Sequence, residues 1–536
     1  MCVIGCGPIG LTAGLLLSRH GLEVTLVERR SELNTHPRSR FVDTNTMELL
    51  REFGLDEQVE QTGLGPDWTA YNRWSDNLAV APYAEIPSPT FHAVPGPASP
   101  CLPVMTVQDE VEKALMSSVA NDPNITVRFD TEVVGLTQTP TEARLTLRDV
   151  RTGRDESLTA GYVIGADGPA SSTRDVIGAV LDGMPRPIYM QDVIFHADLD
   201  PYVGDRKGSL LYTQPPEGVL IFQPLDGRRR WRCQVAIGSA ALLGEDAIRA
   251  RILASLGTAD DVELDIASMR MWQPTPGCTT RFMDRRICLA GDAAHVSVPT
   301  GGLGNNSGFS GIRNLAWKLA YVVRGLAPPS ILDSYETEHR PVALERIAFG
   351  VATTGHMQSM MLGHRVGDDI TEHVRGTHQY ADYDHVLRGF ELSSGLVDPE
   401  VDPSPDRSGE KFEPLVRTGR RAPHIWLDAS RSRSVLDHFG RGFVLLVGPE
   451  ADADGWASEL DIALAANEPA ARAVVGVREL PGDVDIAPYR ADEVVLVRPD
   501  GVIAQRRPVP SNGPDLTDFV PYLPPFPNAL DNPGAI

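Results

Sequence analysis

The first 28 residues constrain the fold more strongly than any other part of the chain. An apolar run over residues 2–4 leads into the glycine-rich segment 5–10, and a helical run, a second apolar run over 24–27 and the acid Glu28 follow. This order is typical of a βαβ unit that binds a dinucleotide, because the N-terminus of the helix faces the phosphates. We therefore expect an α/β fold of the Rossmann type.

The three glycines of this segment have separate expected roles. Gly5 permits a tight turn, Gly7 lets the backbone approach a pyrophosphate, and Gly10 lets the helix pack close to the strand. Glu28 ends the second strand, where its carboxylate can accept hydrogen bonds from an adenosine ribose. Glycine turns are common, so the signal comes from strand, glycines, helix, strand and terminal acid occurring in this order.

Two later segments favour FAD over a nicotinamide dinucleotide as the tightly held cofactor. Residues 162–168 form an apolar run that ends in Gly-Ala-Asp-Gly. Residues 286–292 form another that ends in Gly-Asp and continues through the glycine-rich loop 299–306 toward a predicted helix over 315–324. A carboxylate at a strand end can bind cofactor hydroxyls, and such a loop offers backbone N–H groups to an anionic ring. Either segment alone could be an ordinary Asp-Gly turn.

In this order and spacing, the three segments resemble the FAD-dependent aromatic hydroxylases, the group of para-hydroxybenzoate and phenol hydroxylases. Within that group the chain is most similar to the phenol-hydroxylase and polyketide-tailoring branch, over nearly its whole length. The block Gly-Asp-Ala-Ala-His at 291–295 and the segment Asn-Leu-Ala-Trp-Lys at 314–318 are its most specific parts. The arginine segment 36–40 and Gln108 also match positions near the flavin in that family.

The motifs and the resemblance together predict the cofactor site. The expected FAD-binding residues are Gly5, Gly7, Pro8, Gly10, Glu28, Arg29, Arg38, Arg40, Gln108, Asp167, Gly291, Asp292, Pro299, Gly302, Leu303, Gly304 and Asn305. The backbone of the loop is expected to stabilise the pyrimidine edge of the flavin, which is negative in the reduced state. The predicted catalytic residues are therefore Pro299, Gly301, Gly302 and Gly304. His295 stands inside the cofactor block and is a weaker candidate for acid–base catalysis.

The chain departs from the family pattern shortly before residues 314–318. The family usually has an acidic residue there, whereas this chain has Phe-Ser-Gly-Ile-Arg over residues 309–313. Because that region lies near the flavin in relatives, the resemblance implies a change in how the flavin is held. The change bears on simple ring hydroxylation more than on FAD binding, and Gly311 is its centre.

The FAD-binding segments are separated along the chain, so a second domain must be inserted between them. We expect a discontinuous FAD-binding domain over residues 1–180 and 275–396. A mainly antiparallel β-sheet substrate domain is expected over 181–274, with parts of 65–105. A C-terminal domain over 415–536 resembles the thioredoxin-like domain of the phenol-hydroxylase branch. The fold class is therefore α/β with an inserted sheet and a thioredoxin-like end.

The join to the C-terminal domain is expected to be a linker. Residues 397–414 are rich in Pro, Asp, Glu and Ser, a composition typical of a connecting segment. The domain after it has no CxxC pair, so it cannot carry out thiol–disulfide exchange. We expect a structural or dimerisation role for it.

The inserted segment is expected to form the roof of a pocket over the flavin. Strand-like runs over 193–197, 210–213, 219–222 and 231–237 are separated by turn signals. The candidate pocket residues on this sheet or its flank are Tyr212, Gln223, Arg232, Gln234 and Trp272. Alternation along a strand cannot say which face is inward. The basic run 228–230 is interpreted as a solvated turn, with an NAD(P)H phosphate contact as the less favoured alternative.

The resemblance implies a reaction in which NADPH or NADH reduces the flavin and leaves. Oxygen then adds to the flavin as a C4a-hydroperoxide, which hydroxylates an aromatic substrate. A bulky polycyclic polyketide or a phenol is expected, in polyketide or antibiotic biosynthesis. Two alternatives stay open: a Baeyer–Villiger or multi-step oxidation of a polyketide, and a non-catalytic flavin-bound partner protein. A flavin halogenase is less favoured, because no Trp-x-Trp-x-Ile-Pro segment occurs.

Composition excludes several other classes. The formal net charge of −23 argues against nucleic acid as a partner, because that interaction needs basic surface. No stretch approaches the roughly 18 to 20 apolar residues that span a bilayer, so a cytoplasmic protein without membrane contact is expected. Six cysteines without a CxxC pair, and no histidines at zinc-ligand spacing, predict no metal site. A monomer or homodimer is expected.

Overall fold

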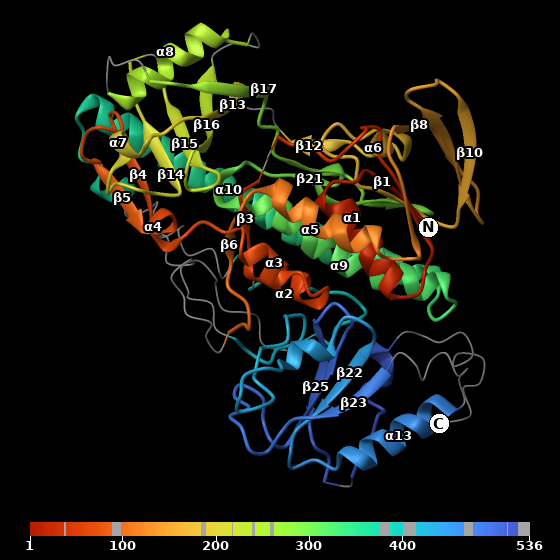
Figure 1. Ribbon diagram of the computed structural model, residues 1–536. Coiled ribbons are helices and arrows are strands. Elements are labelled where there is room, and N and C mark those ends of the chain that lie inside the picture. The colour runs from red at the N-terminus through yellow and green to blue at the C-terminus, as the bar shows by residue number, and fades with distance from the viewer. Residues whose placement is uncertain are drawn as a thin grey trace.

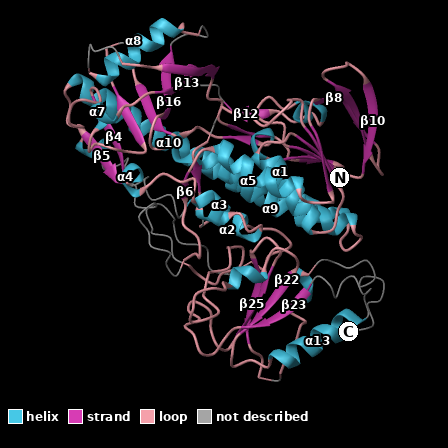
Figure 2. Cartoon of the chain, in the orientation of Figure 1, coloured by secondary structure: helices cyan, strands magenta, loops and turns pink. Residues whose placement is uncertain are grey.

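The computed structural model describes the chain apart from several segments. The residues outside the description are 37–38, 88–97, 184–188, 217, 238–241, 258–261, 375–385, 387–388, 400–413, 466–474, 512 and 524–536. Figure 1 shows three parts, namely a central stack of helices on a parallel sheet, a second sheet beyond it, and a C-terminal part that packs below the centre. Helices, strands and loops alternate in all three (Figure 2). Within the described residues, no helix is both long and apolar enough to cross a membrane.

The central part is built on a parallel sheet with the strand order β19-β20-β11-β1-β2-β7. Its strands are β1 (Cys2–Ile4), β2 (Val24–Val27), β7 (Ile125–Arg128), β11 (Val163–Gly165), β19 (Met283–Asp284) and β20 (Ile287–Leu289). All pairs are parallel except β19 with β20. The inner strands are continuous buried apolar runs, as expected for a parallel sheet covered on both faces.

Three helices cover one face of this sheet. They are α1 (Pro8–Arg19), α5 (Gln108–Ala120) and α9 (Leu303–Val323), and they lie side by side in Figure 1. A small antiparallel sheet of β8 (Thr131–Gln138), β9 (Ala143–Asp149) and β10 (Asp155–Ala160) stands at the far end. The carboxyl ends of β1, β2, β11 and β20 therefore meet at one edge, where the glycine and aspartate motifs follow them.

The second sheet has the strand order β17-β13-β16-β15-β14-β4-β5. Its strands are β4 (Tyr71–Ser75), β5 (Ala84–Pro87), β13 (Tyr189–His196), β14 (Leu210–Thr213), β15 (Leu220–Pro224), β16 (Arg230–Ile237) and β17 (Asp265–Trp272). Every pair is antiparallel except β14 with β4. The four strand-like runs predicted in the inserted segment correspond to β13, β14, β15 and β16.

The two faces of the seven-stranded sheet have different coverings. Helix α8 (Glu245–Leu256) packs on the outer face through an apolar cluster that includes Phe195, Phe222 and Trp231. The inner face is turned toward the central part. There Ile194 packs with Val107, which directly precedes α5.

A long helix joins the central part to the inner face. Helix α10 (Asp333–Val366) packs on α9 with its first half. Its second half carries Met357, Met360 and Met361, which pack against Trp74 and Tyr212 of the sheet. The same helix therefore contacts both the cofactor-binding part and the predicted pocket.

The C-terminal part has the mixed sheet order β23-β22-β24-β25 of a thioredoxin-like domain, as the sequence predicted. Its elements are β22 (Phe443–Val447), α13 (Ala453–Ala465), β23 (Val475–Glu479), β24 (Glu493–Val497) and β25 (Ile503–Pro508). Strand β22 is parallel to β23 and antiparallel to β24, which is antiparallel to β25. Most of the predicted linker, residues 400–413, lies outside the described residues.

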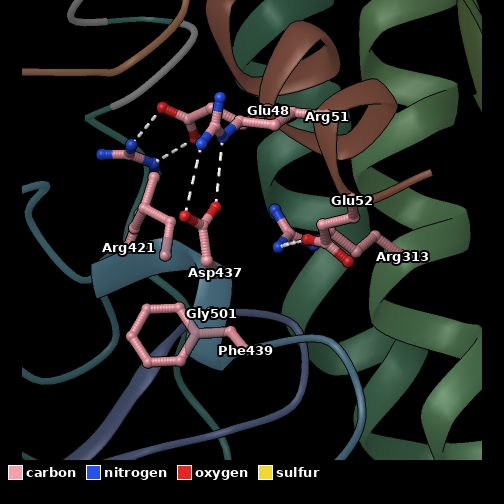
Figure 3. Close-up of a pocket in the computed structure, with 9 residues that line it drawn as sticks. Glu48, Arg51, Glu52, Arg313, Arg421, Asp437, Phe439 and Gly501 are labelled. Atoms are coloured by element: carbon pink, nitrogen blue, oxygen red, sulfur yellow. Dashed lines mark hydrogen bonds and ion pairs between the residues drawn. The ribbon is translucent and has the colours of Figure 1, made fainter. Parts of the chain in front are cut away.

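Ion pairs join this C-terminal part to the helices above it. Figure 3 shows Arg421 against Glu48 and Asp437 against Arg51, where Glu48 and Arg51 belong to α2 (Thr44–Glu52). A second contact lies deeper, where Arg498 pairs with Glu338 of α10 and both side chains are fully buried. The C-terminal part is therefore docked through charged groups as well as through its apolar core.

Short elements complete the described structure. They are β3 (Phe41–Val42), α3 (Asp56–Glu60), α4 (Pro66–Thr69), β6 (Val104–Met105), α6 (Ser172–Val176), β12 (Leu181–Gly183), α7 (Asp200–Val203), β18 (Gly277–Thr279), β21 (His295–Val296), η2 (Gly291–Ala293), η3 (Thr300–Gly302), η4 (Pro329–Leu332), η5 (Val435–His438) and η6 (Val520–Tyr522). Strands β12, β18 and β21 form a small antiparallel sheet, and β3 pairs with β6. The pair β3–β6 lies where the chain passes between the two large sheets (Figure 1).

Candidate active site

The glycine-rich loop after β1 has the geometry that its sequence predicts. Gly5 has a φ of +104°, and a Cβ there would lie 2.5 Å from the Ala166 oxygen. A Cβ on Gly10 would lie 1.9 Å from the Gly5 oxygen, so both positions require glycine. A Cβ on Gly7 would meet nothing within 4 Å. The loop thus leaves open space in front of α1, which begins at Pro8 without a capping side chain. Its uncapped first turn can bind an anion such as a pyrophosphate.

Glu28 lies at the end of β2 and also supports this loop. Its Oε2 accepts a hydrogen bond from the Cys6 N–H at 3.0 Å, and its Oε1 accepts one from the Arg30 N–H at 3.0 Å. The neighbouring Arg29 is exposed. The carboxylate is therefore fixed beside the glycines, and a ribose would reach it from the same edge of the sheet.

The two aspartate motifs lie at the same edge. Asp167 accepts hydrogen bonds from the Ser171 hydroxyl at 2.6 Å and the Thr173 N–H at 3.0 Å, so it stabilises the start of α6. Gly291 has a φ of +60°, and a Cβ there would lie 3.0 Å from Ile9 of α1. Asp292 follows it in η2 and is half-buried. The parallel sheet thus brings the three glycine and acid motifs together.

The predicted flavin loop turns into a helix earlier than the sequence suggested. Gly301 and Gly302 have φ values of +85° and +63°, and α9 begins directly after them at Leu303. The expectation that this helix spans 315–324 was therefore wrong at its start, because two left-handed glycines turn the chain straight into helix. Residues 303–306 form the first turn, and no side chain caps it. Pro299 stands just before η3.

Asn306 is a residue of this turn whose role sequence reasoning missed. Its Nδ2 donates to the Phe41 oxygen at 3.1 Å, and its Oδ1 accepts from the Asp43 N–H at 3.0 Å and the Thr46 hydroxyl at 2.8 Å. The side chain thus ties the first turn of α9 to β3 and α2. The signal available in the sequence was an asparagine at the end of a glycine-rich segment.

The position that departs from the family pattern lies in the contact between α9 and α10. A Cβ on Gly311 would lie 2.6 Å from Nε2 of His339. The imidazole of His339 occupies the space that a side chain at 311 would need, and it bonds the Ser307 oxygen at 3.1 Å. Burial lowers the pKa of His339 well below its usual value. The family's acid is therefore replaced here by a glycine, and the neutral ring of His339 packs against it.

His295 lies in the core beside this contact. It is 1% exposed, and neither ring nitrogen has a hydrogen-bond partner among the described protein atoms. Burial, together with the positive charge of Arg346, lowers its pKa to about 4. The ring is therefore neutral at pH 7 and packs between Phe282 and His339.

The arginine segment before β3 is only partly described. Arg38 lies outside the described residues. The side chain of Arg40 extends to the second sheet and donates to the oxygens of Ser209 at 2.7 Å and Pro224 at 2.8 Å. Gln108 starts α5, and its main-chain N–H donates to the Ser39 oxygen at 2.9 Å. This segment therefore connects the cofactor-binding part with the second sheet.

The structure decides which face of the second sheet is inward. The register pairs Gln234 with Asp192 and Ile221, and Arg232 with Ile194 and Gln223. Side chains paired across adjacent strands share a face. All five predicted pocket residues share the inner face: Tyr212, Gln223, Arg232, Gln234 and Trp272.

Asp192 connects four of these five side chains and was missed by the sequence reasoning. It forms an ion pair with Arg232, and its Oδ1 accepts from Gln234 Nε2 at 3.0 Å and Trp272 Nε1 at 2.9 Å. Gln223 joins through its Nε2, which donates to Gln234 Oε1 at 2.8 Å. An acid in the middle of an apolar strand was the available signal.

The surroundings of Asp192 keep it ionised. Burial by itself would raise the pKa of this carboxyl, but the charge of Arg232 and the hydrogen bonds from its neighbours outweigh burial and hold the pKa at about 2. His36 lies beside it, with 3.9 Å between Nε2 and Oδ2, and its Nδ1 bonds the Ser268 hydroxyl at 2.8 Å. A buried histidine from the central part thus meets the polar group of the sheet.

The other end of the inner face is aromatic and sulfur-rich. Tyr212 stacks on Trp74 with ring centroids 4.7 Å apart, and its hydroxyl lies 3.9 Å from Sδ of Met357. Methionine side chains adapt to different shapes and interact favourably with aromatic rings. The face therefore has one polar end and one end suited to flat apolar groups.

The basic run 228–230 is only partly a solvated turn. Arg230 pairs with Asp109 of α5 at 3.1 Å and donates to the Thr35 oxygen at 3.4 Å. Arg229 is exposed, and its nearest acid is Glu263 at 3.9 Å. The run thus contributes one arginine to the contact between the sheet and the central part.

Comparison with known proteins agrees with this geometry. Residues 1–349 match the family described as FAD binding domain, and residues 416–520 match the family described as aromatic-ring hydroxylase, C-terminal. The chain belongs to the FAD-dependent aromatic hydroxylases. It is an FAD-dependent monooxygenase that acts on small aromatic molecules.

The relatives are named for oxygenation of different compounds, aklavinone and a nitrocatechol among them. Aklavinone 12-hydroxylase DnrF of Streptomyces peucetius is 31% identical, over 84% of this chain and 91% of its own length. The 4-methyl-5-nitrocatechol 5-monooxygenase of a Burkholderia species is 29% identical, over 94% and 93%. The crystal structure of the flavin-dependent monooxygenase PieE with FAD and substrate is 26% identical, covers 95% of both chains and superposes with a TM-score of 0.84.

Proposed function

We propose that this monooxygenase hydroxylates a bulky polycyclic aromatic, of the polyketide type, with NADPH or NADH as reductant and O2 as oxygen donor. One observation carries the proposal: three side chains of the inner face bond the buried carboxylate of Asp192, and a fourth, Gln223, joins them through Gln234. A polar group of this size beside an aromatic and methionine-rich area suits a flat substrate with hydrogen-bonding substituents. One relative, from Streptomyces halstedii, is named a putative polyketide hydroxylase, and another an aklavinone 12-hydroxylase.

FAD fits the residues at the edge of the parallel sheet. We propose that the open space at Gly7 takes the pyrophosphate, that Glu28 and Asp292 bind hydroxyls, and that the first turn of α9 faces the flavin ring. Arg29, Gln108 and Asp167 are proposed to line the same cofactor, together with Arg38, which lies outside the described residues. Arg40, predicted with them, extends its side chain to the second sheet instead. Bound FAD would supply the reduction of oxygen and the transfer of one oxygen atom to the ring.

The loop residues are proposed to stabilise charge rather than to move protons. Pro299, Gly301, Gly302 and Gly304 carry no titratable side chain, so what they can offer is backbone. The N–H groups at the uncapped start of α9 and the positive end of its dipole favour a negative group in front of them. Asn306 keeps that turn in place through β3 and α2.

A phenolic substrate must also lose a proton. Asp192 is a poor acceptor, because a carboxyl with a pKa of about 2 is far too weak a base near neutral pH. We propose that Asp192 orients Arg232, Gln234 and Trp272, and that His36 accepts the proton. Nε2 of His36 is buried and has no hydrogen-bond partner among the described atoms.

The division of the chain follows from these roles. We propose an FAD-binding domain over 1–180 and 275–396, a substrate domain over 181–274 with parts of 65–105, and a C-terminal domain from 415. We propose the cytoplasm as its compartment, because all six cysteines are free, as is usual under reducing conditions. The predicted oligomeric state, monomer or homodimer, is part of this proposal.

The direct test is to follow oxygen into a product. The purified protein would be incubated with NADPH or NADH under labelled O2 and a panel of polycyclic quinones and phenols. We expect NAD(P)H oxidation to rise with a polycyclic compound and the product to gain one labelled oxygen atom. Asp192→Asn should reduce product formation, whereas Asp265→Asn, on the exposed end of β17, should not. NAD(P)H oxidation without any oxygenated product, or labelling of phenols alone, would refute the proposal.

A further inference from the structure

The side chain of Arg40 is a buried cation that forms no ion pair with a carboxylate in the described part of the chain. It is 8% exposed, and its partners are the main-chain oxygens of Ser209 and Pro224, at 2.7 and 2.8 Å. Among the described residues no carboxylate forms an ion pair with it. Burial, with a smaller contribution from the positive charge of Arg232, lowers the pKa of Arg40 to about 9. A buried charge held only by neutral groups is costly in a folded protein.

The nearby acid cannot serve Arg40, because it is already engaged. Asp192 is paired with Arg232, and its Oδ1 accepts two further hydrogen bonds. Among the described residues, the buried charged side chains here, Arg40, Arg232 and Asp192, therefore carry one positive charge in excess. They are each less than a tenth exposed.

The contacts of Arg40 show which part of the protein surrounds this excess positive charge. Ser209 directly precedes β14 and Pro224 ends β15, so the guanidinium bridges two adjacent strands of the second sheet at one end. Its electrostatic neighbours are Arg232 and Tyr212, which both lie on the inner face. The side chain of Arg40 thus extends from the segment before β3 to the region where the substrate is proposed to bind.

The guanidinium also has donors to spare. Arginine presents five N–H groups in a planar fork, and the two main-chain oxygens use one hydrogen from each terminal nitrogen. The fork is suited to planar anionic oxygens, which form short charge-assisted hydrogen bonds with it. Neutral quinone or hydroxyl oxygens would leave the charge uncompensated.

We propose that Arg40 is a specificity-determining residue that selects aromatic substrates bearing an anionic oxygen, a carboxylate or an ionised phenol. The inference deepens the proposed function and rests on it for the location of the substrate. The anion neutralises the excess charge of the inner face, while Tyr212 and Trp74 at its other end take the flat apolar rings. Arg232 remains paired with Asp192.

The test compares two probes that differ in charge alone. An anthraquinone carboxylate and the matching carboxamide would each be titrated into the oxidised holoenzyme, with the flavin absorbance change reporting the dissociation constant. We expect the wild type to bind the carboxylate at least about tenfold more tightly than the amide. Arg40→Met should weaken carboxylate binding by about 10- to 100-fold and leave amide binding within about twofold. Arg40→Lys, which keeps the charge but loses the fork, should fall between them.

Arg206→Met is the matched control. Its guanidinium also donates only to main-chain oxygens, those of Leu78 and Tyr202, but these residues belong to the cluster on the outer face. It should change neither dissociation constant. Equal binding of both probes by the wild type, failure of the carboxylate to bind, or an equal loss for both probes in Arg40→Met would overturn the proposal.

Two outcomes separate this inference from the proposed function. An Arg40→Met protein that discriminates as the wild type does, but has a changed flavin spectrum or a lower affinity for FAD, would assign Arg40 to the cofactor and refute the anion site. The titration needs no turnover. A preference for the carboxylate without any oxygenated product would therefore leave the anion site standing while the proposed function fails.

Discussion

The buried ion pairs between the C-terminal domain and the helices α9 and α10 allow a quantitative prediction. Arg498 donates from both terminal nitrogens to Glu338, at 2.6 and 2.9 Å, and its Nε donates to Asp500 at 3.1 Å. Lys318 completes the group with 2.7 Å to Glu338. Arg498, Glu338 and Lys318 have no exposed side-chain surface. Two cations and two carboxylates thus balance inside the protein.

Replacing Arg498 by Met should destabilise the protein strongly. The change leaves two buried carboxylates with Lys318 as their remaining cation, and losing one partner of a buried pair costs about 3–5 kcal/mol. The cause is visible in the pKa values: burial alone would raise that of Glu338, yet Arg498 and Lys318 hold it well below the usual range. Removing Arg498 therefore removes the cation with the larger effect on Glu338.

Urea unfolding followed by tryptophan fluorescence measures this loss, and Trp317 reports on the site because Arg498 lies 5.5 Å from its ring centroid. The matched control is Arg51→Met, which breaks the partly exposed pair with Asp437 and should cost no more than about 1 kcal/mol. In the double variant Arg498→Met/Glu338→Gln the net charge is balanced again, so it should be less destabilised than the two single losses added together. A loss below about 1 kcal/mol for Arg498→Met, or additivity in the double variant, would refute the reasoning.

Three further predictions concern the cofactor edge, the proton acceptor and the buried histidines. Gly10→Ala should lose bound FAD, because its Cβ would lie 1.9 Å from the Gly5 oxygen; the ratio of flavin to protein absorbance measures this, and Gly161→Ala, with open space around it, should keep FAD. His36→Asn should slow product formation by about 100-fold or more at unchanged FAD content, and a wild-type rate would remove His36 as the proton acceptor. His295 has its pKa lowered to about 4 in the fold against 6.5 as its ordinary value, so the unfolded chain binds the extra proton and stability falls as pH drops from about 6.5 to 4. His295→Leu should show a smaller loss of unfolding free energy between pH 7 and 5, and equal losses in both proteins would contradict this assignment.

The cofactor edge could be predicted from sequence because its requirements are local. Gly5 and Gly10 are demanded by a positive φ and by contacts with backbone atoms close by, so the residue types themselves carry the signal. The start of α9 could not be predicted in the same way, since Gly301, Gly302 and Gly304 have low helix propensity and suggest a loop. Tertiary hydrogen bonds of Asn306 hold that turn against β3 and the start of α2.

The inner face shows what sequence cannot supply. The strand runs were predictable from alternation, but the choice of inward face depends on α8, which covers the opposite side. Asp192 was missed because its partners lie on other strands, Arg232 40 positions away and Trp272 80 positions away. Arg498 and Glu338 are 160 positions apart, so no local pattern could join them. Long-range pairing of charges is set by the assembled fold alone.

Charge balance distinguishes the two buried ionic groups and gives them different roles. At the contact of the C-terminal domain, Arg498 and Lys318 are matched by Glu338 and Asp500, every charge has its partner, and nothing further is needed. On the inner face, Asp192 pairs with Arg232, and no carboxylate of the described residues forms an ion pair with Arg40. A protein tolerates such an imbalance where a ligand restores it, since the cost of the free charge then adds to the selectivity for an anion. The same physical rule therefore assigns the first group to docking of the domain and the second to recognition of the substrate.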